Sequence, residues 1–286
     1  MKQNKVEKLL AGVLSISLAM GVNVMPAFAA QAQDFPHKDM SRVYLTKNYE
    51  LANTGTISPK ETFTFTIDPG TVTDASEGID AADYMPSVGD VSYAQGEAGS
   101  ANKTRQIEIQ LPKYDSVGVY TYIIHEVAGN SAGVTYYGDA ILLRVTVIEQ
   151  DGKLRIAAVH TEDPESTGEG KKDDFDNLYS AGELEVHKDV EGIMGNKEKY
   201  FEFRVQLTGE EGKTYQDSYA ITGGSYDANP ASIEIKPGET TEATFYLKDG
   251  DTIHIENLPY GVEYKVSETP VADYVTTETG TEGEVD

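Results

Sequence analysis

The chain has 286 residues, no cysteine and a formal net charge of -25 at pH 7. Such a charge repels nucleic-acid phosphates and argues against a nucleic-acid partner. Without cysteine, an exported form of the chain depends on core packing, a metal or a covalent bond other than a disulfide. The 18 tyrosines, the absence of Trp and the many Val, Ile and Thr residues favour strands.

Residues 1–30 have the pattern of a secretory signal peptide. Three lysines within the first eight residues precede an apolar stretch over residues 9–24, and Ala-Phe-Ala at 27–29 offers small residues for cleavage. The alternative is an uncleaved membrane anchor, but the apolar stretch is short for a membrane span. We therefore expect a secreted chain with no transmembrane helix in its mature form.

A first domain is expected over residues 34–180, where apolar and polar residues alternate with the period of half-buried strands. Strands are predicted near residues 42–51, 63–67, 107–111, 120–127, 140–148 and 153–160. The polar, Gly-rich segment 68–99 is expected to be a long loop with at most a short helix. Short strands with turn signals between them predict an all-β sandwich.

A second domain is expected over residues 181–286, with strands near 184–190, 201–207, 245–247, 253–255 and 262–266. The boundary near residues 180–182 is very short, so we expect a stiff junction and not a flexible tether.

The two halves repeat each other. Leu-Thr-Lys47 corresponds to Val-His-Lys188, and the Tyr-x-Ile-x-Glu126 strand corresponds to Tyr-x-Val-x-Glu268. Lys47 and Glu126 are 79 positions apart, and Lys188 and Glu268 are 80 apart. An internal repeat of this kind indicates two copies of one structural unit.

Strand parity places these four charged residues on apolar faces, because side chains at i and i+2 share a face of a strand. Each domain is therefore predicted to bury one lysine and one glutamate. Burial disfavours the charged form of either group, which turns a lysine into a neutral nucleophile and a glutamate into a proton donor.

In the first domain Asn177 supplies an electrophile, since it shares a strand face with Phe175 and Tyr179. Attack of the Lys47 amine on the Asn177 carboxamide would release ammonia, with Glu126 moving the protons. This is single-turnover self-processing, not enzyme activity. The alternative is a plain buried Lys–Glu ion pair, with Asn177 as a turn or edge residue. The duplicated spacing and the lack of cysteine favour the covalent interpretation.

At these residues the chain resembles the streptococcal-type pilin isopeptide domains of Gram-positive shell and backbone pilins. The matching motifs are the two strand lysines, the Tyr-x-[Ile/Val]-x-Glu strands, Phe-Asp-Asn177, and the segment from Phe245 to Glu268. The resemblance implies two tandem Ig-like sandwiches of the CnaB type, each with a bond between its first and last strands. It implies a structural role as a pilus shaft or pilin-like stalk on the Gram-positive cell wall, with sortase and neighbouring pilin subunits as partners.

The second domain departs from this pattern. By the spacing of the first domain, the asparagine for Lys188 and Glu268 would stand near position 319, beyond Asp286. The expectation is a second domain without its last strand, and Asn257 is a weak substitute because it lies in mid-domain. In the resembling pilins a lysine shortly before the last strand of the first domain is the sortase acceptor. Lys171 or Lys172 is the candidate here, Lys171 slightly preferred, and a solvated loop is the alternative.

Other function classes have weaker support. An adhesin or ligand-binding module on the same scaffold, with segment 68–99 carrying recognition of a host or surface ligand, is the alternative function. A glycan-processing enzyme needs paired carboxylates in an open cleft, whereas the two glutamates are expected in separate cores. The acidic segments near 68–83 and 249–251 lack EF-hand spacing, and the five histidines are scattered. No metal or cofactor is expected.

Overall fold

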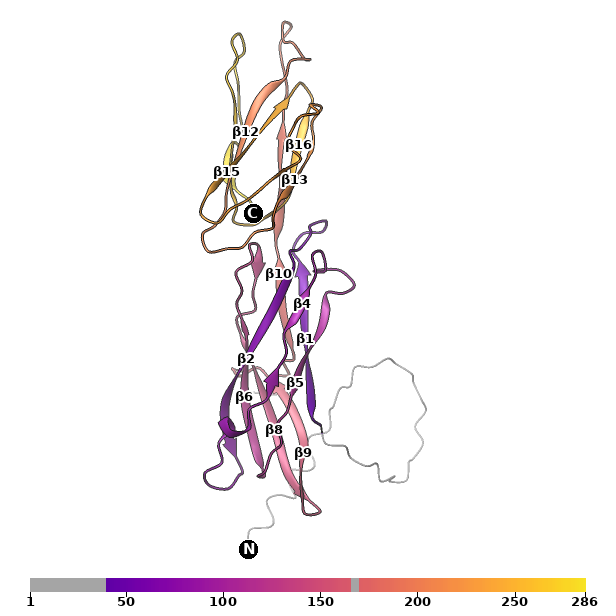
Figure 1. The fold of residues 1–286 in the computed structure, drawn as a ribbon, viewed down its shortest axis with the longest axis vertical. Coiled ribbons are helices and arrows are strands. Elements are labelled where there is room, and N and C mark those ends of the chain that lie inside the picture. The colour runs from indigo at the N-terminus through magenta and orange to yellow at the C-terminus, as the bar shows by residue number, and fades with distance from the viewer. Residues whose placement is uncertain (1–39, 166–169) are drawn as a thin grey trace, which may run out of the picture.

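The computed structural model describes residues 40–165 and 170–286, where the fold is all-β apart from one short 3-10 helix. The all-β class predicted from the sequence is confirmed. Figure 1 shows two β-sandwiches stacked end to end along the long axis of the molecule. The predicted signal peptide, residues 1–30, lies outside the described residues. In the two described ranges no helix has the length and apolar character needed to cross a membrane.

The first sandwich consists of two five-stranded sheets, in the orders β3-β5-β1-β10-β7 and β4-β2-β6-β8-β9. Its elements are β1 (Arg42–Leu51), β2 (Glu61–Thr73), η1 (Ala81–Tyr84), β3 (Ser87–Val88), β4 (Val91–Tyr93), β5 (Thr104–Gln110), β6 (Gly118–Val127), β7 (Val134–Thr135), β8 (Ala140–Gln150), β9 (Lys153–Glu162) and β10 (Asp174–Tyr179). The last strand, β10, pairs in parallel with the first, β1, in the middle of its sheet. The ends of the domain sequence are therefore neighbours.

Segment 68–99 is more ordered than its composition suggests. β2 continues to Thr73, past a register shift opposite β6 that begins at Pro69. A side chain at Gly70 would meet the Thr121 backbone oxygen at 2.7 Å, so a glycine is needed where the two strands approach. Farther along, Ala81 and Tyr93 are buried in the core. The segment is thus part of the sandwich and not one long loop, although the short helix expected within it is present as η1.

The second sandwich has two four-stranded sheets within the described residues, in the orders β11-β16-β13-β14 and β15-β12-β17-β18. Its strands are β11 (Ala181–His187), β12 (Phe201–Thr208), β13 (Tyr219–Gly223), β14 (Ser232–Ile233), β15 (Thr240–Leu247), β16 (Thr252–Pro259), β17 (Glu263–Glu268) and β18 (Glu282–Glu284). β11 stands at the edge of its sheet, paired to β16 on one side, whereas β1 is paired on both sides by β5 and β10.

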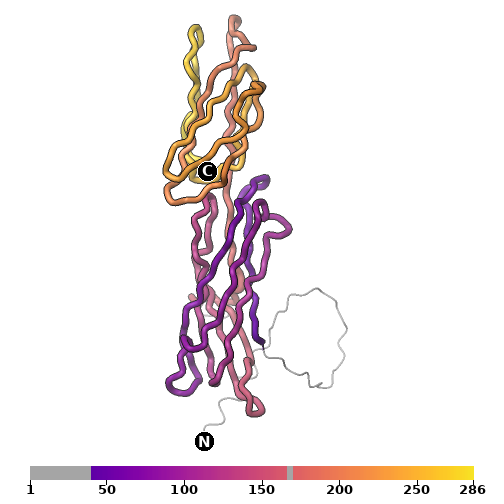
Figure 2. Tube along the Cα trace, viewed as in Figure 1, coloured from indigo at the N-terminus to yellow at the C-terminus, as the bar shows by residue number. Residues whose placement is uncertain are grey.

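The internal repeat of the sequence is visible in the strand registers. β2 pairs with β6 so that Phe65 lies opposite Glu126, and β12 pairs with β17 so that Phe203 lies opposite Glu268. Each sandwich has its own apolar cluster. Ser180 alone separates β10 from β11, and the trace in Figure 2 passes from one sandwich into the other without a loop.

Candidate functional site: a buried lysine, glutamate and asparagine

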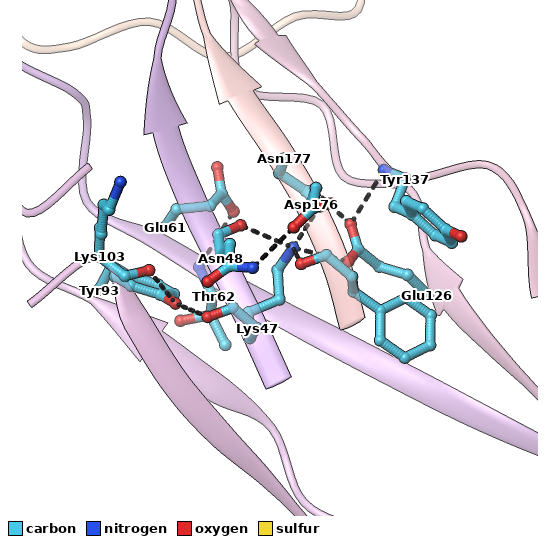
Figure 3. A network of polar contacts seen from close by, with 11 residues as sticks. Lys47, Asn48, Glu61, Thr62, Tyr93, Lys103, Glu126, Tyr137, Asp176 and Asn177 are labelled. Atoms are coloured by element: carbon cyan, nitrogen blue, oxygen red, sulfur yellow. Dashed lines mark hydrogen bonds and ion pairs between the residues drawn. The ribbon is translucent and has the colours of Figure 1, made fainter. Parts of the chain in front are cut away.

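Lys47, Glu126 and Asn177 meet inside the first sandwich (Figure 3). The Lys47 Nζ atom lies 3.0 Å from Glu126 Oε2 and donates a hydrogen bond to Asn177 Oδ1. Asn177 Nδ2 donates to Glu126 Oε1, which closes a triangle of polar contacts. The lysine and the asparagine are 130 positions apart in sequence. The fold, and not local sequence, therefore assembles the site.

The parallel pairing of β1 and β10 positions two corners of this triangle. Lys47 lies opposite Phe175 and Tyr49 lies opposite Asn177, so the lysine and the asparagine are diagonal neighbours on the inner face. On the outer face Asn48 Nδ2 donates to Asp176 Oδ1 at 2.7 Å and ties the same two strands together. Glu126 comes from β6 in the facing sheet.

The site is sealed from solvent. Lys47 is 0% exposed, Asn177 is 2% exposed and the Glu126 side chain is 0% exposed. Burial lowers the pKa of Lys47 to about 8, although the charge of Glu126 opposes this shift. A lysine with a pKa near 8 is a neutral amine for an appreciable part of the time at physiological pH, which is the form that attacks a carbonyl carbon.

The two oxygens of Glu126 face different groups. Oε2 is buried, faces the Lys47 ammonium and accepts no other hydrogen bond, whereas Oε1 faces the Asn177 amide nitrogen. Oε1 also accepts a long hydrogen bond of 3.4 Å from the backbone N–H of Tyr137. One carboxyl group can thus take a proton from the nucleophile and deliver one to the leaving nitrogen, as general acid–base catalysis requires.

Sequence reasoning missed the aromatic residues around the lysine. Lys47 Nζ lies 4.2 Å from the ring centroid of Phe63, and in the second domain Lys188 Nζ lies 4.3 Å from that of Phe201. Both rings begin a Phe-x-Phe pair, at 63–65 and 201–203. This repeated pair was the signal that could have identified them, since the second Phe of each pair faces the glutamate across the strands.

Lys188 and Glu268 also meet, with 2.8 Å between Nζ and Oε2. Their side chains are 13% and 4% exposed, so this pair is less enclosed than the one in the first domain. The second domain has three asparagines, and each hydrogen-bonds to groups other than Lys188. Asn196 caps a turn, Asn229 pairs with Tyr246, and Asn257 pairs with Ile57 of the first domain.

The two lysines proposed as sortase acceptors lie between β9 and β10. The Lys171 side chain is 54% exposed and pairs with Asp173 at 2.6 Å. Lys172 is 28% exposed, pairs with Asp174 at 3.0 Å, and lies 5.2 Å from the ring of Tyr137. Lys172 is therefore the more buried of the two.

The acidic pair Asp249 and Asp251 has structural partners. Asp249 accepts hydrogen bonds from the Val190 backbone and from Lys197, and Asp251 accepts from the Lys248 backbone and from Ser225. Across residues 40–165 and 170–286, no three His, Asp or Glu side chains gather in a way that could hold a metal ion.

Comparison with known proteins gives matches over both domains. Residues 43–180 match the family profile of the Spy0128-like isopeptide containing domain, and residues 182–286 match that of a domain of unknown function. A pilin of Streptococcus pyogenes serotype M1 is 26% identical over 233 residues, which are 80% of this chain and 67% of the relative. The pilus tip adhesin Cpa of Streptococcus pyogenes is 35% identical over 91 residues, 32% of this chain and 12% of the adhesin.

Solved structures of major pilins are also similar to this chain. The crystal structure of the major pilin from Streptococcus pyogenes has a TM-score of 0.53 and 26% identity, covering 80% of this chain and 82% of the pilin. The major pilin T3.2 of the same species has a TM-score of 0.56 over 87% of this chain and 94% of its own, at 21% identity, which supports the fold alone.

Proposed function

Because the first domain belongs to the Spy0128-like isopeptide-containing domains and the chain is homologous to a streptococcal pilin, we propose that this protein is a structural pilus subunit cross-linked by its own side chains. The observation that carries the proposal is the closed triangle of Lys47, Glu126 and Asn177, whose side chains are buried in the core. The protein acts once on itself and on no external substrate.

The reaction balances with the groups present. The Lys47 amine attacks Asn177 Cγ, a nitrogen–carbon bond forms, and the bond from Cγ to Nδ2 breaks. Glu126 Oε2 accepts the proton that the amine loses. Glu126 then donates a proton to Nδ2, which leaves as ammonia, and the carboxylate is regenerated. The product is an amide between two side chains, and no cofactor takes part.

The position of the bond suits a load-bearing stalk. β1 and β10 are the first and last strands of the domain, and tension on the ends of the domain acts on these two strands. An amide between them carries that tension directly, so the rest of the fold is not pulled apart. A chain without cysteine gains in this way the covalent constraint that other exported domains obtain from disulfides.

Intact mass spectrometry tests the proposal. The purified full chain should be lighter than its calculated mass by one ammonia, whereas Lys47→Ala, Glu126→Ala and Asn177→Ala variants should show their full calculated masses. Asn229→Ala is the matched control, because it removes a part-buried, hydrogen-bonded asparagine from the second domain and should still show the mass lower by one ammonia. A parent of full mass would reduce Lys47 and Glu126 to a buried ion pair.

The second domain has two of the three residues of such a site, Lys188 and Glu268. Lys188 pairs with Glu268 and lies over Phe201, as Lys47 pairs with Glu126 and lies over Phe63, and β11 has a free edge within the described residues. A strand added there in the manner of β10 would place its asparagine opposite Val190, two residues after the lysine, as Asn177 lies opposite Tyr49. The asparagine for Lys188 would come from such a strand.

Polymerisation and location complete the proposed role. A shaft subunit is exported, joined to neighbouring pilin subunits by a sortase and held at the Gram-positive cell surface. Lys171 is the preferred acceptor, because its side chain is about twice as exposed as that of Lys172. Segment 68–99, proposed as a recognition loop in the adhesin alternative, contributes buried residues to the core instead of standing free.

A further inference from the structure

The two sandwiches meet through three separate loops of the first domain. Asn53 Nδ2 donates to the backbone oxygen of Ala181 and to the Tyr260 hydroxyl, both at 2.7 Å. Gln95 Nε2 donates to Gln216 Oε1 at 2.7 Å. The loop after β6 meets the second domain in a third place: the Thr214 N–H donates to Asn130 O at 2.8 Å, and the Ala132 N–H donates to Thr214 O at 2.9 Å.

Asn257 adds the most specific of these contacts. Its Oδ1 accepts from the Ile57 N–H at 2.6 Å, and its Nδ2 donates to the Ile57 carbonyl at 2.7 Å. The side-chain amide thus satisfies both backbone groups of one residue, as a neighbouring strand would. Ile57 lies in a segment without strand pairing, so these two backbone groups have no ladder partner of their own.

The backbone of β16 is shaped to present this side chain. β16 has one residue more than β11 between the pairs Leu258–Gly182 and Ile255–Leu184, which is a β-bulge at Glu256 and Asn257. Asn257 has a φ of 60°, in the left-handed region that asparagine tolerates better than most residues. Bulges of this kind re-aim a side chain out of the regular pattern. Here the bulge turns the amide toward the first domain.

The connecting residue is held by both domains. The Ser180 N–H donates to Gly133 O of the first domain at 2.8 Å, and Ser180 O accepts from the Tyr260 N–H of the second at 3.1 Å. Gly133 has a φ of 74°, and a side chain on it would meet Ser180 O at 2.5 Å. Both backbone hydrogen-bonding groups of Ser180 are thus occupied, one by each domain. This restrains the linker, unlike the flexible tethers that join many other domains.

From these contacts we infer that Asn257, together with Asn53, locks the two sandwiches into one rigid rod. Asn257 was weighed from the sequence as a substitute cross-linking partner, and its geometry assigns it this different role. Asn53 belongs to the first domain and hydrogen-bonds to the second, whereas Asn257 belongs to the second domain and hydrogen-bonds to the first. Bending at Ser180 would break both sets of hydrogen bonds at once.

The lock also connects to the cross-linking strand. Tyr179, the last residue of β10, is fully buried, and Asn257 Nδ2 lies 3.5 Å from its hydroxyl. Tyr179 shares its strand face with Asn177, two residues earlier. The strand that carries the proposed amide therefore ends in the junction that Asn257 closes.

Distance measurement between spin labels tests this inference on the full chain. Since the protein has no cysteine, Thr66→Cys and Thr244→Cys introduce one labelling site at an exposed strand position in each domain. In the parent we expect one narrow distance distribution. Combining Asn53→Ala with Asn257→Gly, which keeps the left-handed backbone but removes the amide, should broaden the distribution and extend it to shorter distances.

Asn229→Ala is the matched control. Asn229 makes the same two-way pairing as Asn257, with the backbone N–H and carbonyl of Tyr246, but within the second domain. The control should keep the narrow distribution. Asn257→Asp, which keeps the size and the acceptor but loses the donor, should broaden it partly and serves if the double variant does not fold. A distribution unchanged in both Asn257 variants, or broadened equally by the control, would overturn the inference.

Discussion

The stability contributed by the proposed amide can be predicted from the loop that it closes. The perturbation combines Lys47→Met with Glu126→Gln, which removes the nucleophile and the proton shuttle while keeping similar side-chain volumes. Replacing both residues matters, because removing one partner of a buried ion pair leaves an unpaired charge that costs about 3–5 kcal/mol by itself. The double variant thus reports the missing bond without a buried charge.

The magnitude follows from the separation of the bonded residues. Lys47 and Asn177 are 130 positions apart, and closing a loop of that length removes chain entropy worth about 5 kcal/mol from the unfolded state, if the disulfide relation applies. For a domain of this size, each kcal/mol shifts the melting temperature by roughly 3 °C. The first domain of the double variant should therefore melt about 15 °C below the parent.

Differential scanning calorimetry of the full chain measures this shift, with intact mass confirming the presence or absence of the bond in each sample. The second domain serves as an internal reference, since the two substitutions leave its apolar cluster unchanged. A double variant of full mass whose first domain melts within two or three degrees of the cross-linked parent (about 1 kcal/mol) would refute the loop-closure reasoning.

Three further predictions concern charge, the second domain and polymerisation. In an Asn177→Ala variant Lys47 remains an amine with a folded pKa near 8, below its unfolded value of 10.5. The free energy of unfolding of this variant, relative to that of the parent, should therefore rise by up to about 1.4 kcal/mol per pH unit between pH 8 and 10.5, and this gain should be lost as the pH falls. Denaturant titrations of both proteins that show no such rise would contradict a buried amine. The parent should lose one ammonia and not two, and Lys188→Met combined with Glu268→Gln should leave that loss unchanged; a smaller loss would place the bond in the second domain. Incubation with a pilus sortase and a sorting-motif peptide should give an adduct that Lys171→Ala abolishes and Lys172→Ala retains, and the reverse pattern would make Lys172 the acceptor.

Residue parity predicted the burial of the three side chains of the candidate site because they lie on regular strands. Lys47, Glu126 and Asn177 each share a face with apolar neighbours, and a two-residue period is enough to place them in one core. Which strands would be neighbours came from the resemblance to pilins, since parity alone does not distinguish a parallel pairing of β1 with β10 from other arrangements.

The features that parity could not predict depend on irregular backbone. The strand through Pro69 and Gly70 was read as loop because composition obscures a register shift. Asn257 was considered as a cross-linking residue, but its direction is set by a β-bulge and a left-handed φ, neither of which leaves a periodic trace. Its partner, Ile57, lies 200 positions away on another domain. Contacts between domains depend on how two folded domains pack against each other, which strand periodicity does not encode.

The proposed bond and the proposed lock act on one path through the molecule. Tension that enters at the start of β1 reaches Lys47, crosses the amide to Asn177 and continues two residues along β10 to Tyr179. From there it passes Ser180 into β11, because the junction holds that residue from both sides. With the bond in place, the 130-position interval between the two residues would lie outside this path and would stay folded under load. A bond without the lock would resist stretching but allow bending at Ser180, and a lock without the bond would join two extensible domains. A stiff, inextensible stalk would require both.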